Sequence, residues 1–221
     1  MPSTIDRTGR VKRTVRRTIN AATAADAVGP VTHGAEIYGV SKGQFSLIEL
    51  IEYLLQVSGP AHLVISTWTA AGADLAHART LVDNGAILSA RWLVDYSFPN
   101  RQPGYCQILR ERFGDESIRT TANHAKFVLI HNDEWHLVLR TSMNLNLNRR
   151  LESYEISDDP EMAAWLLDII ADAFAGDASD IATAHRAPGR AKATSETIGG
   201  DIDRRGPEIA FELEGKGVSY D

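Results

Sequence analysis

The chain has 221 residues, of which 43% are hydrophobic and 24% charged, values typical of a soluble globular protein. A chain of this length can bury a hydrophobic core that is stable without disulfides or metal ions. Its single cysteine, Cys106, excludes an internal disulfide and is consistent with a reducing compartment. No stretch approaches the length of an apolar membrane span, and the first twenty residues lack the apolar core of a signal peptide. We therefore expect a cytoplasmic protein with one main domain.

Charge is distributed unevenly along the chain. Residues 1–20 carry six basic residues and one acidic residue, a net charge of +5, whereas the whole chain carries −6. We expect residues 1–30 to be a basic, solvated and flexible N-terminal arm. The alternative is that this arm guides a polyanion toward a site on the acidic body.

The region from His33 to Phe174 alternates short apolar runs with helical periodicity. Ala35–Val40 predicts a strand. Ser46 to Glu49 form a capping box, which predicts the start of a helix, and Gly59-Pro60 ends it. The predicted apolar stripe of this helix consists of Leu47, Ile48, Leu50, Ile51, Leu54 and Leu55.

The alternation of strands and helices continues beyond this helix. The sequence predicts strands at His62–Thr67 and Ile87–Tyr96, and between them a helix at Asp74–Asn84 that Gly85 closes. From Pro99 to Gly114 we expect a loop, with room for a short strand around Cys106–Leu109.

Two apolar runs, Phe127–His131 and Trp135–Arg140, flank a polar turn and predict a β-hairpin. Asp159-Pro160 opens the last helix, because proline favours the first helical turn. Its predicted core stripe consists of Met162, Trp165, Leu166, Ile169 and Ile170.

This order of elements predicts an α/β fold, a mixed central sheet flanked by helices, over residues 31–175. Residues 176–221 contain few large apolar side chains, so we expect a largely flexible C-terminal tail with a short ordered piece near Ile209–Leu213.

The segment from Asn123 to Ile156 holds the residues that suggest chemistry. His124 and Lys126 are two apart at the entry of a strand, so their side chains share a face. Beyond the hairpin, Ser142 and Asn144 are again two apart. One patch is therefore predicted to present an imidazole, an ammonium, a hydroxyl and a carboxamide, and Glu152 or Glu155 follows closely enough to add a carboxylate.

This set of groups suits the cleavage of a phosphodiester. Lys126 and Asn144 can bind the non-bridging oxygens and stabilise charge in the transition state. His124 can attack phosphorus or protonate the leaving alkoxide, and a carboxylate on its other ring nitrogen would fix the tautomer. No acidic cluster of the two-metal type is evident, so we expect no metal and no other cofactor.

The ordered set H-x-K, strand, turn, strand, S-x-N and Glu resembles the HKD motif of the phospholipase D superfamily. The resemblance covers roughly His33 to Phe174, which corresponds to one half of the double-lobed members. It implies that His124, Lys126, Asn144 and Glu152 are catalytic and that Ser142 belongs to the substrate-binding set, where it supports the site through hydrogen bonds. It also implies a phosphohistidine intermediate.

The sequence departs from the family motif at several points. His131 occupies the place of the family's Asp, Asp133 lies two residues later, and Thr141 replaces the Gly. The interval from His124 to Asn144 is three residues longer, which a longer hairpin turn would absorb.

Members with two motifs build one active site from both, whereas this chain has a single motif and no repeat. The resemblance therefore implies a homodimer whose two-fold axis brings two copies of His124 together. We favour a nuclease. The alternatives are a phospholipid phosphodiesterase, a non-catalytic nucleic-acid-binding or assembly protein with the same fold, and an unrelated α/β domain in which the motif is coincidental.

Further candidates for substrate contact lie outside the motif. Trp68 follows a predicted strand and could stack on a base, although packing at the core or its rim is the favoured interpretation. Lys42, Arg149 and Arg150 are candidates for phosphate contacts, with a solvated loop as the alternative. We expect His131 and His136 to be surface or packing residues rather than metal ligands.

Overall fold

The structure, a computed structural model, describes residues 13–147 and 149–175. Eight strands form one mixed sheet. They are β1 (Thr14–Arg17), β2 (Glu36–Ser41), β3 (Ala61–Thr67), β4 (Ile87–Asp95), β5 (Ile118–Thr121), β6 (Phe127–His131), β7 (His136–Thr141) and β8 (Glu152–Asp158).

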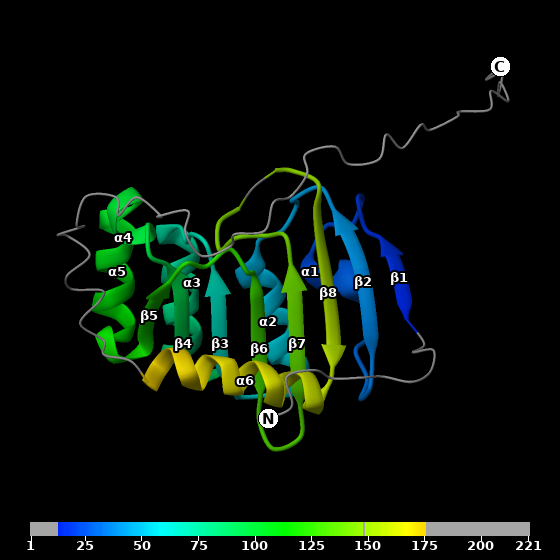
Figure 1. The fold of residues 1–221 in the computed structure, drawn as a ribbon. Helices are drawn as coiled ribbons and strands as arrows, with labels where there is room; N and C mark the ends of the chain where they lie inside the picture. The colour runs from blue at the N-terminus through cyan, green and yellow to red at the C-terminus, as the bar shows by residue number, and fades with distance from the viewer. Residues whose placement is uncertain (1–12, 148, 176–221) are drawn as a thin grey trace, which may run out of the picture. The chain divides into compact units, whose positions relative to one another are not determined.

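The strand order is β1-β2-β8-β7-β6-β3-β4-β5. The pairs β1–β2, β3–β4 and β4–β5 are parallel, and the four central pairs from β2 to β3 are antiparallel. The antiparallel block places the hairpin β6–β7 at the centre of the sheet, between β3 and β8 (Figure 1). The predicted fold class is confirmed.

Helices cover both faces of the sheet. In Figure 1, α6 crosses the face toward the viewer, while α1, α2 and α3 lie behind the sheet. The larger core lies on their side, and a smaller core lies under α6. The helices are α1 (Ala24–Val28), α2 (Leu47–Ser58), α3 (Gly72–Asp83), α4 (Phe98–Arg101), α5 (Pro103–Phe113) and α6 (Pro160–Ala175), with a 3-10 turn η1 (Asp115–Ser117).

Helix α2 forms as its sequence predicts. Ser46 Oγ accepts a hydrogen bond from the Glu49 amide at 3.4 Å, and Glu49 Oε2 accepts one from the Ser46 amide at 2.6 Å. The cap satisfies two amides that the first turn leaves without helical partners. All six residues of the predicted stripe are buried in the larger core. At the other end, Gly59 has a φ of +75° and its amide donates to Leu55 O.

The short strand predicted around Cys106–Leu109 is wrong, because these residues lie in helix α5. Pro103 stands in the first turn of this helix, where the absence of its N–H costs nothing. Cys106 and Leu109 are three residues apart, so they share one helix face, and both are buried in the larger core. The spacing of these two residues fits a helix, whereas an apolar run this short does not by itself distinguish a helix from a strand.

The core stripe of α6 differs from the prediction at one position. Leu166 and Ile170 are buried, and Met162 and Trp165 pack against the smaller core. Ile169, however, is 43% exposed. Because the sheet lies on only one side of α6, an apolar stripe without Ile169 is wide enough to cover the sheet. None of the helices in the described part of the chain is long and apolar enough to cross a membrane.

The predicted N-terminal arm contains a strand, β1, and a helix, α1. Strand β1 extends the sheet beside β2, and Arg13 forms ion pairs with Glu155 at 2.7 Å and with Glu36 at 3.4 Å. Helix α1 is held by Tyr154, whose hydroxyl donates to Ala27 O at 3.1 Å. The prediction of a flexible arm is therefore wrong for residues 13–30. Residues 1–12 and the predicted tail, including Ile209–Leu213, lie outside the described residues.

Candidate functional site

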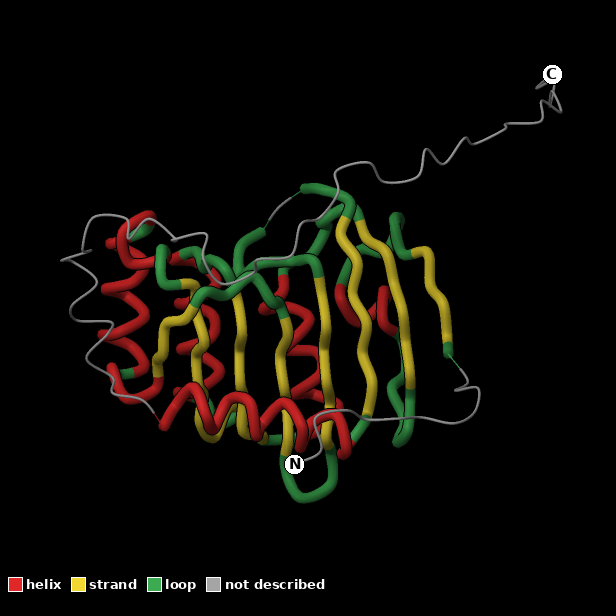
Figure 2. Tube along the Cα trace, in the orientation of Figure 1, coloured by secondary structure: helices red, strands yellow, loops and turns green. Residues whose placement is uncertain are grey.

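The candidate site lies at one edge of the central sheet. Strands β3 and β7 end at the edge where the antiparallel strands β6 and β8 begin. Figure 2 shows the connecting loops gathered there above the strands. Because neighbouring strands run in opposite directions, segments that are distant in sequence come to the same edge. They are Trp68 after β3, His124 before β6, Ser142 after β7 and Glu152 at the start of β8.

His124 and Lys126 lie in the extended segment that leads into β6. The amide of Thr141 donates to Lys126 O at 3.2 Å, so this segment continues the β6–β7 pairing past the end of the strands. His124 is exposed and Lys126 is half-buried. Lys126 Nζ donates to His124 O at 3.3 Å, which holds the ammonium close to the histidine backbone and leaves its other protons for a ligand.

A buried polar network fixes the segment that carries His124. Asn123 is 6% exposed, and its Nδ2 donates to Ser66 Oγ at 3.0 Å and to Leu93 O at 3.1 Å. Its Oδ1 accepts from the Ala125 amide at 3.0 Å. Ser66 Oγ in turn donates to Ala125 O at 3.0 Å. The backbone on both sides of His124 is thus tied to β3 and β4, so the exposed imidazole stands on a rigid support.

Ser142 and Glu152 form the opposite side of the site. The Ser142 hydroxyl donates to Glu152 Oε2 and accepts from the Ser153 amide at 3.0 Å. Thr141, at the position of the family's Gly, donates from Oγ1 to Ser153 O at 2.8 Å and accepts from the Met143 amide at 3.0 Å. These bonds hold the turn out of β7 against β8, so Thr141 is accommodated at this position.

Asn144 lies between two buried residues, Met143 and Leu145. The amide of Leu145 donates to Thr69 O at 3.2 Å, which ties this segment to the chain that follows β3. Asn144 Oδ1 is buried without a hydrogen-bond partner in the described part of the chain. A carboxamide oxygen that lacks a hydrogen-bond donor at the edge of a site could accept a hydrogen bond from a bound ligand.

The structure separates the two candidate glutamates. Glu152 contacts Ser142 at the edge of the sheet, whereas Glu155 lies further along β8. Glu155 forms ion pairs with Arg140 at 2.6 Å and with Arg13 at 2.7 Å. Its carboxylate is therefore engaged in the packing of β1, β7 and β8. This arrangement favours Glu152 as the site carboxylate.

His131, in the place of the family's Asp, lies at the far end of β6. It lies seven positions after His124 along extended chain, a span of about 23 Å at about 3.3 Å per residue. It pairs in register with His62 and His136 on the neighbouring strands. Burial, His62, His136 and Arg91 lower the pKa of His131. The replacement of the family's Asp by His131 therefore lies outside the candidate site.

The remaining candidates lie in loops at the same edge. Lys42 follows β2, whose last residue pairs with Glu152, and its side chain is exposed. Arg149 and Arg150, in the loop between β7 and β8, are exposed as well. Trp68 is half-buried, and its ring centroid lies 6.1 Å from that of His124.

Two residues that support the site were not identified from the sequence. They are Asn123, described above, and Asp95, which is 7% exposed and accepts a hydrogen bond from the Asn123 amide at 3.1 Å. Asp95 is the last residue of β4. A carboxylate at the end of a long apolar strand is the sequence signal that could have indicated Asp95. Among the described residues, no group of three or more His, Cys, Asp or Glu side chains is placed to hold a metal ion.

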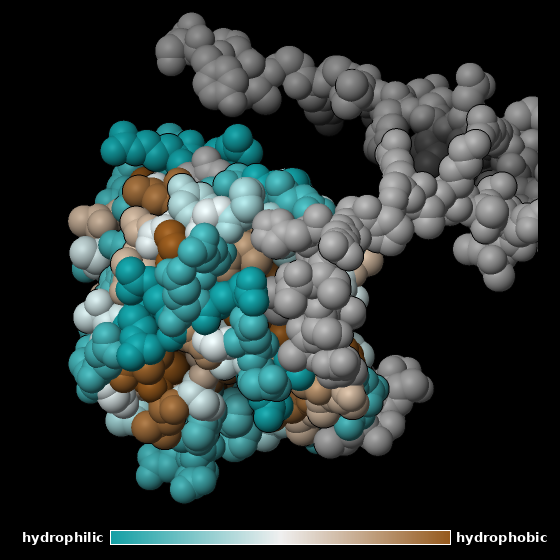
Figure 3. Space-filling model, turned by 90° about the vertical axis from the view of Figure 1, so that its left-hand side faces the viewer, coloured by the Kyte–Doolittle hydropathy of each residue, from teal (hydrophilic) through white to brown (hydrophobic). Residues whose placement is uncertain are grey.

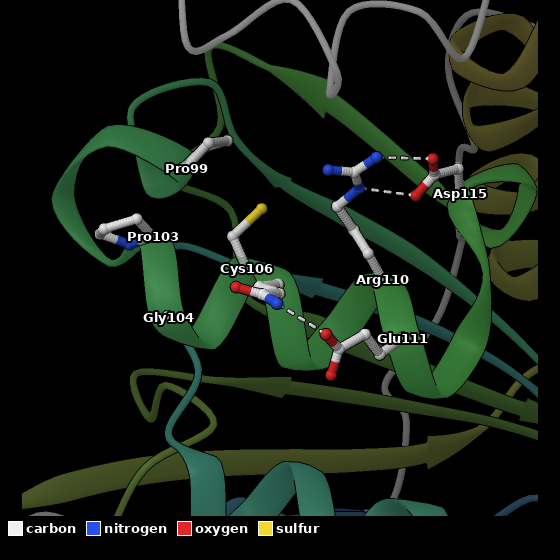
Figure 4. Close-up of a pocket in the computed structure, with 8 residues that line it drawn as sticks. Pro99, Pro103, Gly104, Cys106, Arg110, Glu111 and Asp115 are labelled. Atoms are coloured by element: carbon white, nitrogen blue, oxygen red, sulfur yellow. Dashed lines mark hydrogen bonds and ion pairs between the residues drawn. The ribbon is translucent and has the colours of Figure 1, made fainter.

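A separate cavity of about 500 Å³ lies beside α5, and none of the predicted catalytic residues lines it (Figure 4). Cys106 and a bidentate ion pair between Arg110 and Asp115 form part of its wall. Burial raises the pKa of the Cys106 thiol, which disfavours the reactive thiolate. Figure 3 views the end of the domain formed by α4 and α5, where hydrophilic side chains predominate and hydrophobic ones form small separate patches.

Comparison with known proteins gives structural similarities only. No family model matches the sequence, and no curated protein matches it. The chain is similar to Nuc from Salmonella typhimurium, described as a phospholipase D family member, with 14% identity and a TM-score of 0.47 over 63% of this chain and 93% of that one.

Two further solved structures are similar at the same level. NucT from Helicobacter pylori has 15% identity and a TM-score of 0.47 over 63% of this chain and 96% of that one. Polyphosphate kinase from Porphyromonas gingivalis has 11% identity and a TM-score of 0.48 over 64% of this chain and 26% of that one. The structures similar to this chain thus include a phospholipase D family member, and the motif between His124 and Glu152 resembles that family.

Proposed function

We propose that this chain is a phosphodiesterase that cleaves nucleic acid through a phosphohistidine intermediate on His124, without a metal cofactor. The observation that supports the proposal is the edge of the sheet at which the segment of His124 and Lys126, which leads into β6, lies beside the end of β7 that precedes Ser142 and Asn144, next to the start of β8 at Glu152. An exposed imidazole on a rigid backbone, with an ammonium beside it, can meet a phosphodiester that approaches from solvent.

The first chemical step is attack by a neutral ring nitrogen of His124 on phosphorus. A P–N bond forms, the P–O bond to the leaving alkoxide breaks, and that oxygen takes a proton from a second imidazole. Lys126 and the amide of Asn144 bind the non-bridging oxygens, which carry more charge in the transition state. In the second step water attacks phosphorus, the P–N bond breaks, and the second imidazole takes the proton from the water.

The partner subunit's His124 is the proposed second imidazole. A two-fold axis at this edge of the sheet would place two equivalent histidines on opposite sides of one phosphodiester. Glu152 is the proposed carboxylate that keeps the imidazole in the required tautomer. A monomer would lack the general acid and would be nearly inert, so activity should fall with dilution below the dimer dissociation constant.

Nucleic acid is the proposed substrate because basic side chains surround the same edge. Lys42, Arg149 and Arg150 are exposed in the loops that follow β2 and precede β8. Phosphate groups on both sides of the scissile bond would contact these loops, and such contacts weaken as salt rises. Arg13 is engaged with Glu155 and Glu36, so the support comes from the edge loops rather than from Arg13.

The test is cleavage of labelled single-stranded DNA, duplex DNA and RNA in EDTA. The wild type is compared with His124→Ala and with His62→Ala, a matched control because His62 is an exposed histidine outside the site that hydrogen bonds to Ser89 at 2.8 Å. We expect EDTA-resistant cleavage by the wild type and by His62→Ala, and none by His124→Ala.

Other results would change the assignment. Cleavage that requires a metal, or that survives His124→Ala, would overturn the histidine mechanism. Hydrolysis of phosphatidylcholine vesicles without cleavage of nucleic acid would keep the mechanism and overturn the substrate. Binding of nucleic acid without cleavage by a confirmed dimer would indicate a non-catalytic binding protein.

A further inference from the structure

Trp68 lies beside His124, outside both hydrophobic cores. It follows the end of β3, and the rings of Trp68 and His124 meet edge-on, with centroids 6.1 Å apart and an interplanar angle of 61°. Trp68 belongs neither to the larger core nor to the apolar residues packed against either core. Trp68 is half-buried, and its ring contacts His124 of the site, so it lies within reach of a ligand bound there.

Arg101 from α4 holds the indole ring from one side. Its Cζ lies 3.7 Å from the ring centroid of Trp68, a close cation–π stack. The guanidinium is fixed at two points, because Nη2 donates to Trp68 O at 2.9 Å and Nε donates to Ser97 Oγ at 2.8 Å. One face of the indole is therefore covered by a fixed cation, and a ligand can stack only on the other.

Asp95 connects this stack to the segment that carries His124. Its Oδ1 accepts hydrogen bonds from the Ser97 amide at 2.9 Å and from the Ser97 hydroxyl. Its Oδ2 accepts from the Asn123 amide at 3.1 Å. A single buried carboxylate thus anchors the support of the indole and the support of the imidazole, so the two rings keep a fixed relation.

We propose that Trp68, backed by Arg101, is a stacking subsite for an unpaired nucleobase of the nucleotide next to the scissile phosphate. A half-buried indole leaves part of its apolar surface accessible, and every base has a π-face that can stack on an aromatic ring. Within a duplex both faces of a base are covered by neighbouring pairs. The subsite therefore selects single-stranded nucleic acid and tolerates all base types. This inference rests on the proposed function for its scissile phosphate.

The first test is equilibrium binding, which does not depend on cleavage. Fluorescence anisotropy in EDTA measures the affinity of the His124→Ala protein for three labelled probes: a single-stranded DNA oligonucleotide, its duplex, and the same strand with abasic sites. We expect the single strand to bind on the order of 10-fold more tightly than the abasic strand, the magnitude of one base–aromatic stack. Equal affinities for these two strands would overturn the proposal.

The second test replaces the tryptophan. Trp68→Leu should weaken binding of the single strand on the order of 10-fold and leave binding of the abasic strand unchanged. Trp68→Tyr should restore much of the loss because it keeps an aromatic face. Trp165→Leu is the matched control, since Trp165 is another half-buried tryptophan that packs on the smaller core under α6. Equal effects of Trp68→Leu and Trp165→Leu would contradict the subsite.

Cleavage by the protein with an intact His124 separates this inference from the proposed function. If the wild type cleaves in EDTA but Trp68→Leu cleaves single-stranded and duplex DNA at the wild-type ratio, the subsite is wrong and the function stands. If Trp68-dependent binding is observed but no phosphodiester is cleaved, the subsite stands and the function is wrong.

Discussion

Replacing Asn123 by alanine tests whether the buried network holds the proposed nucleophile. The side chain makes three hydrogen bonds of 3.0–3.1 Å, to Ser66, Leu93 and Ala125. Ser66 Oγ keeps its bond to Ala125 O, but Leu93 O and the Ala125 amide lose their side-chain partner in a buried setting. Two buried backbone groups without a hydrogen-bond partner and the lost bond to Ser66 Oγ together lower the free energy of unfolding by about 3–4 kcal/mol.

Asn132→Ala is the control for this substitution. Asn132 lies just beyond the other end of β6 and its side chain also bonds to two carbonyls and two amides, at 2.8–3.1 Å. It is half-buried, so water can replace part of what is lost, and we expect a cost of about 1 kcal/mol. Urea denaturation followed by circular dichroism measures both free energies of unfolding.

Activity should separate the two variants more strongly than stability. Displacement of His124 by about 1 Å is expected to reduce cleavage by Asn123→Ala about 100-fold under conditions where the protein remains folded. Asn132→Ala should cleave at the wild-type rate. Full activity of a folded Asn123→Ala protein, or equal losses in both variants, would refute the view that this network positions the histidine.

Three further predictions concern other parts of the domain. Glu152→Gln should lower cleavage at least about 10-fold, whereas Glu155→Gln should cost about 1 kcal/mol of stability or less and retain cleavage; equal activities would contradict the choice between the two glutamates. Because the pKa of His131 lies below its ordinary value of 6.5, the unfolded chain binds more protons, and stability should fall as the pH drops through 6.5 toward the folded pKa. Urea titrations from pH 7.5 to 5.5 should show a smaller loss for His131→Asn than for the wild type, and parallel losses would exclude this origin. An alanine Cβ at Gly39 would overlap the ring of Tyr154, so Gly39→Ala should lower stability by about 3 kcal/mol, and an unchanged melting temperature would show that the ring moves freely.

Local patterns predicted the elements that carry strong signals of their own. The capping box of α2, its six buried apolar residues and the hairpin β6–β7 follow from short-range chemistry, and the structure confirms them. Strands β1, β5 and β8 were not predicted. Only Tyr154 and Ile156 are apolar among the seven residues of β8, which becomes a strand because β2 and β7 pair with both of its edges. Pairing with β2 and β7 depends on the tertiary fold, so the spacing of apolar residues along the sequence does not predict it.

The candidate site was predicted in its reactive groups but not in its supports. The H-x-K and S-x-N spacings identified His124 and Ser142, because alternation along neighbouring strands follows directly from the sequence. Asp95 and Arg101 come from a different part of the chain and reach the site only because β4 lies beside β3 and α4 follows it. For Trp68 the sequence leaves both base stacking and packing open, because it does not indicate that Arg101 covers one face of the ring.

The most direct test of the account is detection of a phosphorus–nitrogen bond on His124. A labelled oligonucleotide is mixed with excess enzyme in EDTA, quenched within the first turnover in alkaline detergent, where phosphohistidine is stable, and the peptides are sequenced by mass spectrometry. The account predicts that the peptide containing His124 carries an oligonucleotide fragment joined through its phosphorus to the imidazole, absent from His124→Ala and present in His62→Ala. Turnover without an adduct on His124, or with an adduct on another residue, would contradict it.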